Sequence, residues 1–186
     1  MDRELAAPFP DVLAGAHRGQ AWAFDWLFRW LGRPVGGYLR NGGAEDPDGL
    51  ANEVFLRAFR RIGTFAGDER SFRSWVFTIA HNALCDDRRR RSRSCVTVPL
   101  ERAGDARSAP GADVAALGNL GDERALELLA ALSDGQRDVL LLRVVADLSL
   151  EETAAATGLT VGAVKALQHR ALATLRRTMP LEAVSP

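Results

Sequence analysis

Cysteine and long apolar runs are scarce in this sequence, and each shortage excludes a class of protein. Cys85 and Cys95 are the only cysteines among 186 residues, too few for a small secreted scaffold held together by disulfides. No apolar run approaches the roughly 20 residues that a membrane-spanning helix needs. The segment after Met1 also lacks the apolar core of a secretory signal. We therefore expect a cytoplasmic protein without membrane insertion.

The formal net charge is zero, but the cations are unevenly distributed. Lys165 is the only lysine, so arginine supplies almost all of the positive charge. Five of the cations fall within six positions, namely Arg88, Arg89, Arg90, Arg91 and Arg93. The stretch 160–179 contains no acid and holds Lys165, Arg170, Arg176 and Arg177. Acids elsewhere would reduce non-specific attraction to DNA but leave these segments positive, so the balanced total does not exclude nucleic-acid binding.

Strand-like alternation is absent, and helical spacing takes its place. Apolar side chains recur every three or four residues, which predicts helices. The pattern is helical from Ala14 to Ile62, with a kink or break expected over 32–37, where Pro34 stands among three glycines. We predict an all-α protein with two small helical domains, over 10–96 and 121–180. A flexible linker over 97–120, rich in glycine and small polar residues, would join them.

Capping residues predict where individual helices begin. Asp46, followed by a proline, should cap a helix whose apolar face is formed by Leu50, Val54, Phe55, Ala58, Phe59 and Ile62. After a loop over 63–70, Ser71 should cap the next helix, which runs into the arginine cluster. Asp122 should cap the first helix of the second domain. The four tryptophans lie at helical spacing and are expected mostly in the core: Trp22, Trp26, Trp30 and Trp75.

Two further segments fit the capping box, in which a serine and a residue three positions later satisfy each other's backbone groups. The first is 133–136, which should open a helix that buries Val139, Leu140, Leu142 and Val145. The second is 149–152, which should open a short helix ending at Ala156. Gly158 would then form a tight turn, and Thr160 would cap a long helix that ends near Thr178.

Two helices joined by a short glycine turn form the geometry with which many proteins read DNA. Small side chains at Ala154 and Ala155 would allow the two helices to cross closely. The second helix would turn inward Val161, Val164, Ala171 and Leu175. Its groove-facing residues would be Lys165, Ala166 and His169, while phosphates would be contacted by Arg170, Arg176 and Arg177. The alternative interpretation is an ordinary α-hairpin of a helical bundle.

Several segments, taken in order, resemble the extracytoplasmic-function sigma factors, which form group 4 of the sigma-70 family of RNA polymerase subunits. The segment 52–60 is similar to their core-polymerase-binding helix, and 71–82 is similar to their −10-binding segment. The segments 132–143, 148–154 and 162–165 resemble their −35-binding domain. Because all of these segments occur in the family's order, the resemblance covers roughly residues 20–178.

The resemblance implies a sigma factor that directs core RNA polymerase to promoter DNA and assists strand opening. The implied contacts with core polymerase are Leu50, Asn52, Glu53, Leu56 and Arg57. The implied −10 contacts, around a site for an extruded base, are Thr64, Phe65, Asp68, Arg70, Ser71, Arg73, Trp75, Asn82, Arg88 and Arg89. The implied −35 contacts are Thr160, Lys165, Ala166, His169, Arg170 and Arg176. Many relatives are held inactive by a small protein, so an anti-sigma factor is a further candidate partner.

The sequence also departs from the family. Gly49 stands where an acid is usual, Asn52 where glutamine is usual, and His81 where arginine is frequent. The recognition helix often carries Lys-Ser-Arg-Leu, whereas this chain has Lys-Ala-Leu-Gln over 165–168. A base-reading arginine is therefore missing, and the −35 preference of the family does not transfer to this chain.

We predict no catalytic residue, no cofactor and no metal site. His81 and Cys85 lie one helical turn apart, but two ligands are too few for a structural metal site. The acids Asp86 and Asp87 have no partner base or phosphate loop, and we expect them to moderate the neighbouring arginines. Two other hypotheses are a stand-alone helix-turn-helix regulator, which usually carries an α/β receiver domain, and a nucleic-acid enzyme such as a recombinase, which needs a nucleophile or clustered carboxylates.

Overall fold

The computed structural model describes residues 7–94 and 127–178, in two compact units that divide after Cys95. Every regular element in these residues is a helix, so the all-α prediction is confirmed. None of the described helices is long and apolar enough to cross a membrane. The expected linker and the expected Asp122 cap lie outside the described residues. The domain limits of 10–96 and 121–180 stay a prediction.

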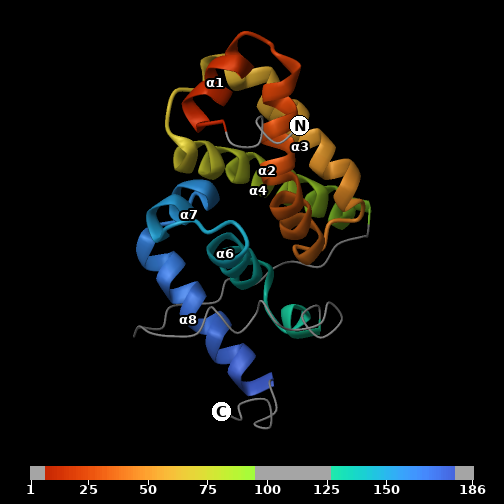
Figure 1. The fold of residues 1–186 in the computed structure, drawn as a ribbon. Helices are drawn as coiled ribbons and strands as arrows, with labels where there is room; N and C mark the ends of the chain where they lie inside the picture. Colours follow the sequence, from red (N-terminus) through yellow and green to blue (C-terminus); the bar gives the residue numbers. More distant parts are fainter. Residues whose placement is uncertain (1–6, 95–126, 179–186) are drawn as a thin grey trace, which may run out of the picture. The chain divides into compact units, whose positions relative to one another are not determined.

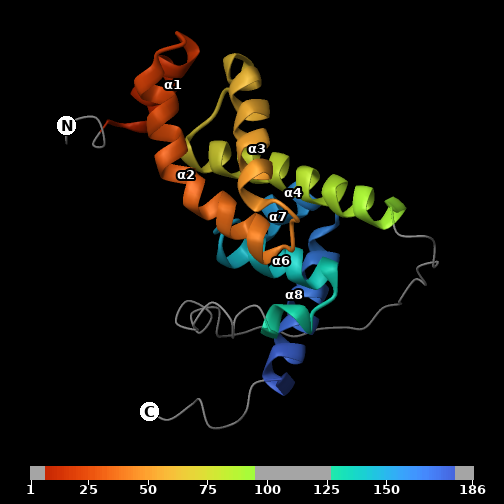
Figure 2. The same cartoon turned by 90° about the vertical axis from the view of Figure 1, so that its right-hand side faces the viewer.

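Residues 7–94 of the N-terminal unit form four α-helices and one short 3-10 helix (Figure 1): α1 (Phe9–His17), α2 (Ala21–Asn41), α3 (Pro47–Arg61), η1 (Ile62–Thr64) and α4 (Glu69–Ser94). Figure 2 shows α2 and α3 side by side, with α4 crossing both. The largest fully buried side chains of this unit come from α1, α2 and α4 and include Val12, Leu27, Leu31, Val35, Tyr38, Leu39, Phe72, Phe77 and Leu84. These residues form the core that positions the outer faces of α3 and α4.

Helix α1 was not expected, and the predicted helical start at Ala14 was wrong. The helix begins five residues earlier, at Phe9, and ends at His17. Gly19 follows with a φ of 72°, a left-handed conformation that glycine adopts at little cost, and separates α1 from α2. The buried side chains Phe9, Val12 and Ala16 recur at helical spacing and pack α1 onto its neighbours.

The expected break over 32–37 is absent. Helix α2 continues from Ala21 to Asn41 with Pro34 inside it. A proline in a helix interior removes one hydrogen bond and costs about 3 kcal/mol. This cost is offset because the buried stripe continues on both sides of the proline, with Leu31 before it and Val35 and Tyr38 after it. Tertiary packing here outweighs the local helix-breaking preference.

The start of α3 is confirmed, whereas the start of α4 differs from the prediction. The Asp46 side chain accepts a hydrogen bond from the Gly49 backbone N–H at 2.9 Å, and Pro47 is the first helical residue. Helix α4 begins at Glu69, so the expected cap at Ser71 was wrong. Asp68 takes the capping role because its carboxylate accepts from the Ser71 backbone N–H at 2.8 Å. The loop is therefore shorter than predicted and covers only residues 65–68.

The tryptophans lie at the edges of the core, and the prediction that they are mostly core residues was too strong. Trp22, Trp26, Trp30 and Trp75 are all half-buried. The Trp22 indole N–H donates to the Gln20 side chain at 3.1 Å, which gives this polar atom a partner near solvent. Tryptophan is large and carries one polar atom, so complete burial of its ring is uncommon. The adjacent Leu27 and Leu31 supply the fully buried contacts instead.

The C-terminal unit contains α6 (Asp134–Val144), α7 (Leu150–Thr157) and α8 (Val161–Thr178), preceded by a short helical turn over 127–130 (Figure 1). The predicted capping box at the start of α6 is present, and the Gln136 side chain accepts from the Ser133 backbone N–H at 3.1 Å. Val139, Leu140 and Leu142 are buried as predicted, and the expected core residue Val145 is half-buried.

One side chain from each helix of the C-terminal unit meets in a small core. Val139 of α6, Ala154 of α7 and Val164 of α8 form this cluster, and Leu150, Val161 and Leu167 pack against it. Ala154 therefore permits the close crossing that the sequence predicted. The same prediction for Ala155 was wrong, because Ala155 is exposed. On an α-helix, adjacent residues point about 100° apart, so only one of the two alanines can face the neighbouring helix.

Candidate polymerase and promoter interfaces

The outer surface of α3 carries the candidate polymerase contacts. Leu56 is 55% exposed, although it is a large apolar residue in the middle of a helix. Asn52 is exposed too, and Glu53 and Arg57 form a half-exposed ion pair one turn apart, with 2.5 Å between their charged atoms. These four side chains share the solvent-facing side of the helix. Leu50 differs, because it is only 6% exposed and packs inside the unit.

Phe28 adds an apolar residue that the sequence did not single out. It lies on α2 and is 44% exposed. Its ring contacts Phe55 of α3 with a centroid distance of 4.8 Å, and Phe55 precedes the exposed Leu56 in the chain. No local signal would have distinguished it from a core phenylalanine, since it lies at helical spacing among buried neighbours. Exposed aromatic residues are enriched at protein interfaces, so Phe28 is a further candidate for the polymerase surface.

The loop between η1 and α4 brings two candidate −10 residues together. Phe65 and Trp75 are both half-buried, and their rings lie 5.1 Å apart with an interplanar angle of 32°. Beneath them, the fully buried Phe72 contacts Phe65 edge-on at 5.1 Å and Trp75 at 5.5 Å. The Thr64 hydroxyl donates to the Arg61 carbonyl at 2.9 Å and fixes the start of the loop. Two partly accessible rings thus rest on a buried third ring.

Polar groups border these rings at the start of α4. Asp68 is exposed, and hydrogen bonds from the Ser71 hydroxyl and the Ser71 backbone N–H lower its pKa. The nearby Arg70 contributes in the same direction. The carboxylate is therefore ionised near neutral pH and holds the first turn of α4 in place. Asp68, Arg70 and Ser71, all exposed, provide hydrogen-bonding groups beside the Phe65 and Trp75 rings.

The remaining −10 candidates are spread along α4. Arg73 is half-buried and lies over the Phe77 ring, 5.7 Å from its centroid, a distance suitable for a cation–π contact. Asn82 is exposed two turns farther along. Arg89 is exposed and pairs with Asp86 at 3.0 Å. These positions extend the candidate surface from the loop toward the arginine cluster.

Two arginines of the cluster have structural partners that the sequence did not indicate. Arg88 donates to the Gly42 carbonyl at 2.6 Å, and Arg91 donates to the Gly43 carbonyl at 2.7 Å. These bonds attach α4 to the turn that follows α2. Asp87 also pairs with Arg91 at 3.1 Å, so the prediction that the two acids moderate the arginines is confirmed. DNA contact by Arg88 and Arg89 stays a prediction.

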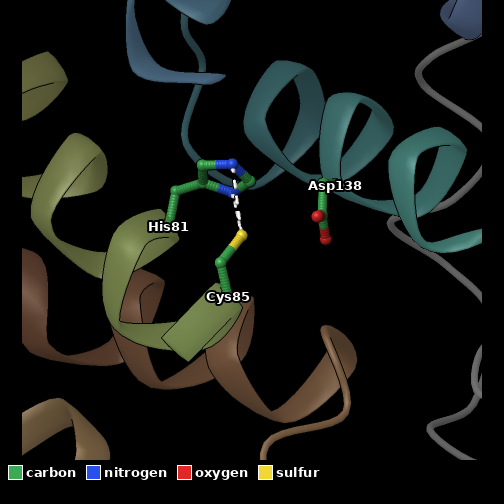
Figure 3. Close-up of side chains that lie close together, drawn as sticks. All are labelled: His81, Cys85 and Asp138. Atoms are coloured by element: carbon green, nitrogen blue, oxygen red, sulfur yellow. Dashed lines mark hydrogen bonds between the residues drawn. The ribbon is translucent and has the colours of Figure 1, made fainter. Parts of the chain in front are cut away.

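His81 and Cys85 form a hydrogen-bonded pair on α4 (Figure 3). The Cys85 sulfur lies 3.6 Å from Nε2 of His81, and the Tyr38 hydroxyl lies 2.9 Å from its Nδ1. His81 is only 8% exposed, so these contacts supply the polar partners that a buried imidazole needs. Asp138, which Figure 3 also draws, belongs to α6 of the other unit.

The predicted helix-turn-helix is present in the C-terminal unit. Ser149 and Glu152 form the capping box of α7, and Gly158 ends this helix with a φ of 70°. Thr160 Oγ1 then accepts from the Ala163 backbone N–H at 3.2 Å and caps α8. Each of these local features was predicted from the sequence. The turn between α7 and α8 therefore consists of residues 158–160 alone.

Helix α8 separates its buried and exposed side chains as predicted. Val164, Ala171 and Leu175 are buried, and Val161 is half-buried against the core. The exposed −35 candidates are Thr160, Lys165, His169 and Arg176, whereas Ala166 and Arg170 are half-buried. Helix α8 has no acid of its own, but one acid on α7 does influence it.

That acid is Glu151, whose pKa is lowered. The causes are hydrogen bonds from its own backbone N–H and from the Ser149 hydroxyl, followed by the charges of Lys165 and Arg143. Because Glu151 is exposed, its charge partly balances Lys165 at the surface of the unit. The sequence did not show this relationship, since the two residues belong to different helices.

Comparison with known proteins assigns both units. A family model described as Sigma-70 region 2 matches residues 25–94, and one described as Sigma-70, region 4 matches residues 122–175. The ECF RNA polymerase sigma factor BldN of Streptomyces coelicolor is 35% identical over 182 residues, which cover 96% of this chain and 68% of BldN. The chain belongs to the sigma-70 family.

Further relatives agree with this assignment. The ECF RNA polymerase sigma factor SigD of Mycobacterium tuberculosis is 36% identical over 154 residues, covering 81% of this chain and 70% of SigD. Among solved structures, CnrH of Cupriavidus metallidurans, in complex with the cytosolic domain of CnrY, superposes with a TM-score of 0.64 at 28% identity. That match covers 94% of this sigma factor and 97% of the CnrH chain.

The family assignment establishes the function at the level of the whole chain. This sigma factor directs RNA polymerase to promoters for transcription initiation, with core polymerase and promoter DNA as its partners. The hypothesis of a regulator with an α/β receiver domain is wrong, because residues 7–94 contain helices and match sigma-70 region 2. The relatives named above are sigma factors and not recombinases.

Proposed function

We propose that this sigma factor uses three separate surfaces, one for polymerase and two for promoter DNA. The outer face of α3 binds core polymerase, the Phe65 and Trp75 rings hold an extruded −10 base, and the exposed side of α8 binds the −35 element. The chain acts in the cytoplasm as a non-catalytic subunit. The observation that carries the proposal is that each surface exposes side chains that the fold does not need, above all Leu56 at 55% exposure.

The polymerase surface combines one apolar residue with hydrogen-bonding neighbours. Leu56 and Phe28 provide apolar area, whereas Asn52 and the pair of Glu53 and Arg57 provide polar groups. Burial of such an apolar centre inside a polar rim is the usual anatomy of a protein interface. Residues of this kind contribute binding free energy without contributing to the stability of the unit. Leu50, buried beneath them, supports the helix from inside.

The −10 surface offers stacking to a base that has left the duplex. Extrusion of a base costs a few kcal/mol of lost stacking and pairing. Stacking on an aromatic side chain returns about 1–3 kcal/mol per base, so one or two rings compensate much of this cost. Phe65 and Trp75 supply the rings, and Asp68, Arg70 and Ser71 supply polar groups beside them. Thr64, Arg73, Asn82, Arg88 and Arg89 extend this surface along η1 and α4.

The −35 surface is the exposed side of α8 beside the tight turn. Lys165 and His169 lie one turn apart and are both exposed, which suits contacts in a major groove. Ala166 lies between them, while Thr160, Arg170 and Arg176 are placed for phosphates on either side. Glu151 lowers the net charge near Lys165, so part of the affinity should come from base contacts and less from non-specific attraction.

An anti-sigma factor remains part of this proposal. CnrH, to which this chain is similar over almost its full length, was solved in complex with the cytosolic domain of CnrY. We infer that a regulatory protein of comparable kind binds this sigma factor and covers the exposed apolar residues Phe28 and Leu56. Its binding would then exclude core polymerase from the same surface.

Run-off transcription from a genomic promoter library, with purified core polymerase, tests the three surfaces together. Leu56→Ala should weaken core binding about tenfold, since a buried leucine side chain contributes roughly 1.5–3 kcal/mol. Trp75→Ala should leave core binding unchanged and reduce strand opening. Lys165→Ala should reduce protection of the −35 element only. Arg18→Ala, at an exposed position that follows α1 and is not part of α3, is the control. Wild-type core affinity of Leu56→Ala would remove α3 from the polymerase interface.

A further inference from the structure

Helix α1 has no role in the function described so far. The Sigma-70 region 2 match begins at residue 25, after α1 has ended at His17. The helix nevertheless docks firmly, because Phe9 is only 7% exposed and Val12 is completely buried. It packs against α2 and also against η1, the element that leads into the loop over 65–68. Helix α1 therefore lies at the base of the proposed −10 surface.

A single ring connects α1 to this surface. Phe9 contacts the fully buried Phe72 with a centroid distance of 5.6 Å. Phe72 in turn contacts both rings of the proposed base site, Phe65 at 5.1 Å and Trp75 at 5.5 Å. Trp30 closes the group, 6.0 Å from Phe9 and 6.3 Å from Phe72. All five separations fall within the range of favourable aromatic pairs.

Phe72 packs against both Phe65 and Trp75 and holds them in place. Phe9 of α1 in turn packs against Phe72. A base that stacks on Phe65 or Trp75 needs these rings in one fixed orientation before it arrives, because ordering them during binding would reduce affinity. Phe72 can shift only if Phe9 and Trp30 leave space for it, since interiors are close-packed. The position of Phe9 thus restricts the position of the two half-exposed rings.

We propose that Phe9 is a positioning residue for promoter opening, acting through Phe72 on the rings that receive the extruded base. The inference rests on the proposed −10 site. It assigns to α1, an element outside the matched family segment, a part in strand opening that is separate from polymerase binding and from −35 recognition. Loss of the Phe9 ring leaves Phe65 and Trp75 in place but lets their orientation vary, so the extruded base is held less well.

The test uses complete holoenzyme on a promoter identified by the genomic run-off experiment. Strand opening is measured by permanganate reactivity of thymines in the −10 region of duplex DNA, and the yield of run-off transcript is compared on duplex DNA and on the same promoter with a pre-opened −10 bubble. Phe9→Ala and Phe9→Leu are compared with wild type, together with the matched control Val12→Ala. Leucine retains most of the apolar volume and the docking of α1 but removes the ring. Val12 is fully buried on the same helix and outside the ring contacts described above.

We expect both Phe9 variants to open duplex DNA about two- to tenfold more slowly, the effect of losing one or two aromatic pairs. On the bubble template the difference should shrink, because the bases are already unstacked. Core affinity and −35 protection should equal those of wild type, and Val12→Ala should open the duplex normally.

Four results would overturn the inference. An equal defect in Val12→Ala would mean that docking of α1 matters and the ring does not. An equal defect of Phe9→Leu on duplex and bubble would indicate general loss of structure. Normal opening by both Phe9 variants, with a defect in Trp75→Ala, would refute the role of Phe9 and leave the −10 site intact. If Trp75→Ala also opened normally, the −10 site itself would be wrong, and the inference with it.

Discussion

The hydroxyl oxygen of Tyr38 lies 2.9 Å from Nδ1 of His81, and this contact joins α2 to α4 inside the N-terminal unit. Tyr38 is completely buried, and the edge of its ring also packs against Phe77 at 5.7 Å. The contact pairs the only tyrosine of the chain with His81, one of the positions at which the sequence departs from the family resemblance. The departure at His81 is thus matched by a buried partner on another helix.

Tyr38→Phe should destabilise the N-terminal unit by about 1–2 kcal/mol, because it retains the ring but removes the hydroxyl partner of a buried imidazole. All four tryptophans belong to this unit, so urea unfolding followed by tryptophan fluorescence reports on it alone. His81→Phe with Tyr38→Phe, which removes both polar groups, should recover part of the loss. Unchanged stability of the single variant would show that the hydroxyl contributes nothing at this position.

Arg88 and Arg89 are neighbours in the chain, but their substitution by alanine should affect the stability of the N-terminal unit to different extents. Arg88→Ala removes a 2.6 Å hydrogen bond to the Gly42 carbonyl and should lower stability by about 1–2 kcal/mol, as for other bonds that involve a charged donor. Arg89 is exposed and paired only with a surface acid, so Arg89→Ala should change stability by less than about 0.5 kcal/mol. Tryptophan-monitored urea unfolding measures both changes.

The affinity of the holoenzyme for promoter DNA is the second quantity to measure for the arginine variants. Arg89→Ala should reduce affinity of the holoenzyme for promoter DNA and make it less sensitive to salt, because a phosphate contact is lost. The prediction fails if Arg89→Ala destabilises the unit as much as Arg88→Ala does, or if the salt dependence of DNA binding does not change.

Two glycines at the tight turn of the C-terminal unit should respond differently when each is replaced by alanine. Gly158 has a φ of 70°, and a Cβ atom there would meet no neighbour within 4 Å, so alanine would introduce backbone strain alone. Gly158→Ala should cost about 1–2 kcal/mol. Gly162 lies in the first turn of α8, and its Cβ would come only within 3.9 Å of Thr160 Oγ1. Gly162→Ala should therefore be neutral or stabilising by up to about 1 kcal/mol.

Because this unit has no tryptophan, its unfolding is followed as the part of the far-UV circular dichroism change that does not coincide with the tryptophan-fluorescence transition. The fluorescence transition of the N-terminal unit serves as the internal control and should not move in either variant. Equal effects of the two alanines would mean that the left-handed conformation at Gly158 is not required for the turn.

Local signals predicted the parts of the fold that depend on a few adjacent residues. Asp46, the two capping boxes and Gly158 each act within four residues of chain, and each lies where the sequence placed it. The inward and outward sides of α8 followed from helical spacing in the same way. For these features the backbone hydrogen bonds to be satisfied are local, so tertiary structure has little influence on them.

Features that depend on distant segments could not be predicted. Pro34 indicated a break, but packing on both sides keeps α2 continuous. Arg88 looked like a free cation, whereas the Gly42 carbonyl, 46 residues earlier, is its partner. Helix α1 was the exception, since Phe9, Val12 and Ala16 at helical spacing before Gly19 would have revealed it. Leu56 was a candidate only by resemblance, because exposure of a leucine has no local signature.

The capping residue Asp68 provides a prediction about pH. Hydrogen bonds from Ser71 stabilise the ionised carboxylate in the folded chain and lower its pKa from the ordinary value of 3.8. A lowered folded pKa means that this stabilisation is complete above pH 4 and is lost as the pH falls through the folded value. Asp68→Asn keeps a capping oxygen but removes the charge. Wild type should therefore be more stable than this variant at pH 6, and the difference should shrink as the pH falls below 4.

Tryptophan-monitored urea unfolding at pH 6, 4 and 2.5 measures this difference directly. Other carboxylates titrate in the same range in both proteins, so subtraction of the two curves isolates the contribution of residue 68. Asp68→Ala serves as the matched control, because it removes the capping oxygen as well and should stay less stable than Asp68→Asn at every pH. If the difference between wild type and Asp68→Asn were the same at pH 6 and 2.5, the charge of Asp68 would have no part in fixing the first turn of α4. The loop over 65–68 would then be held by its aromatic contacts and by the hydrogen bond of Thr64 to the Arg61 carbonyl.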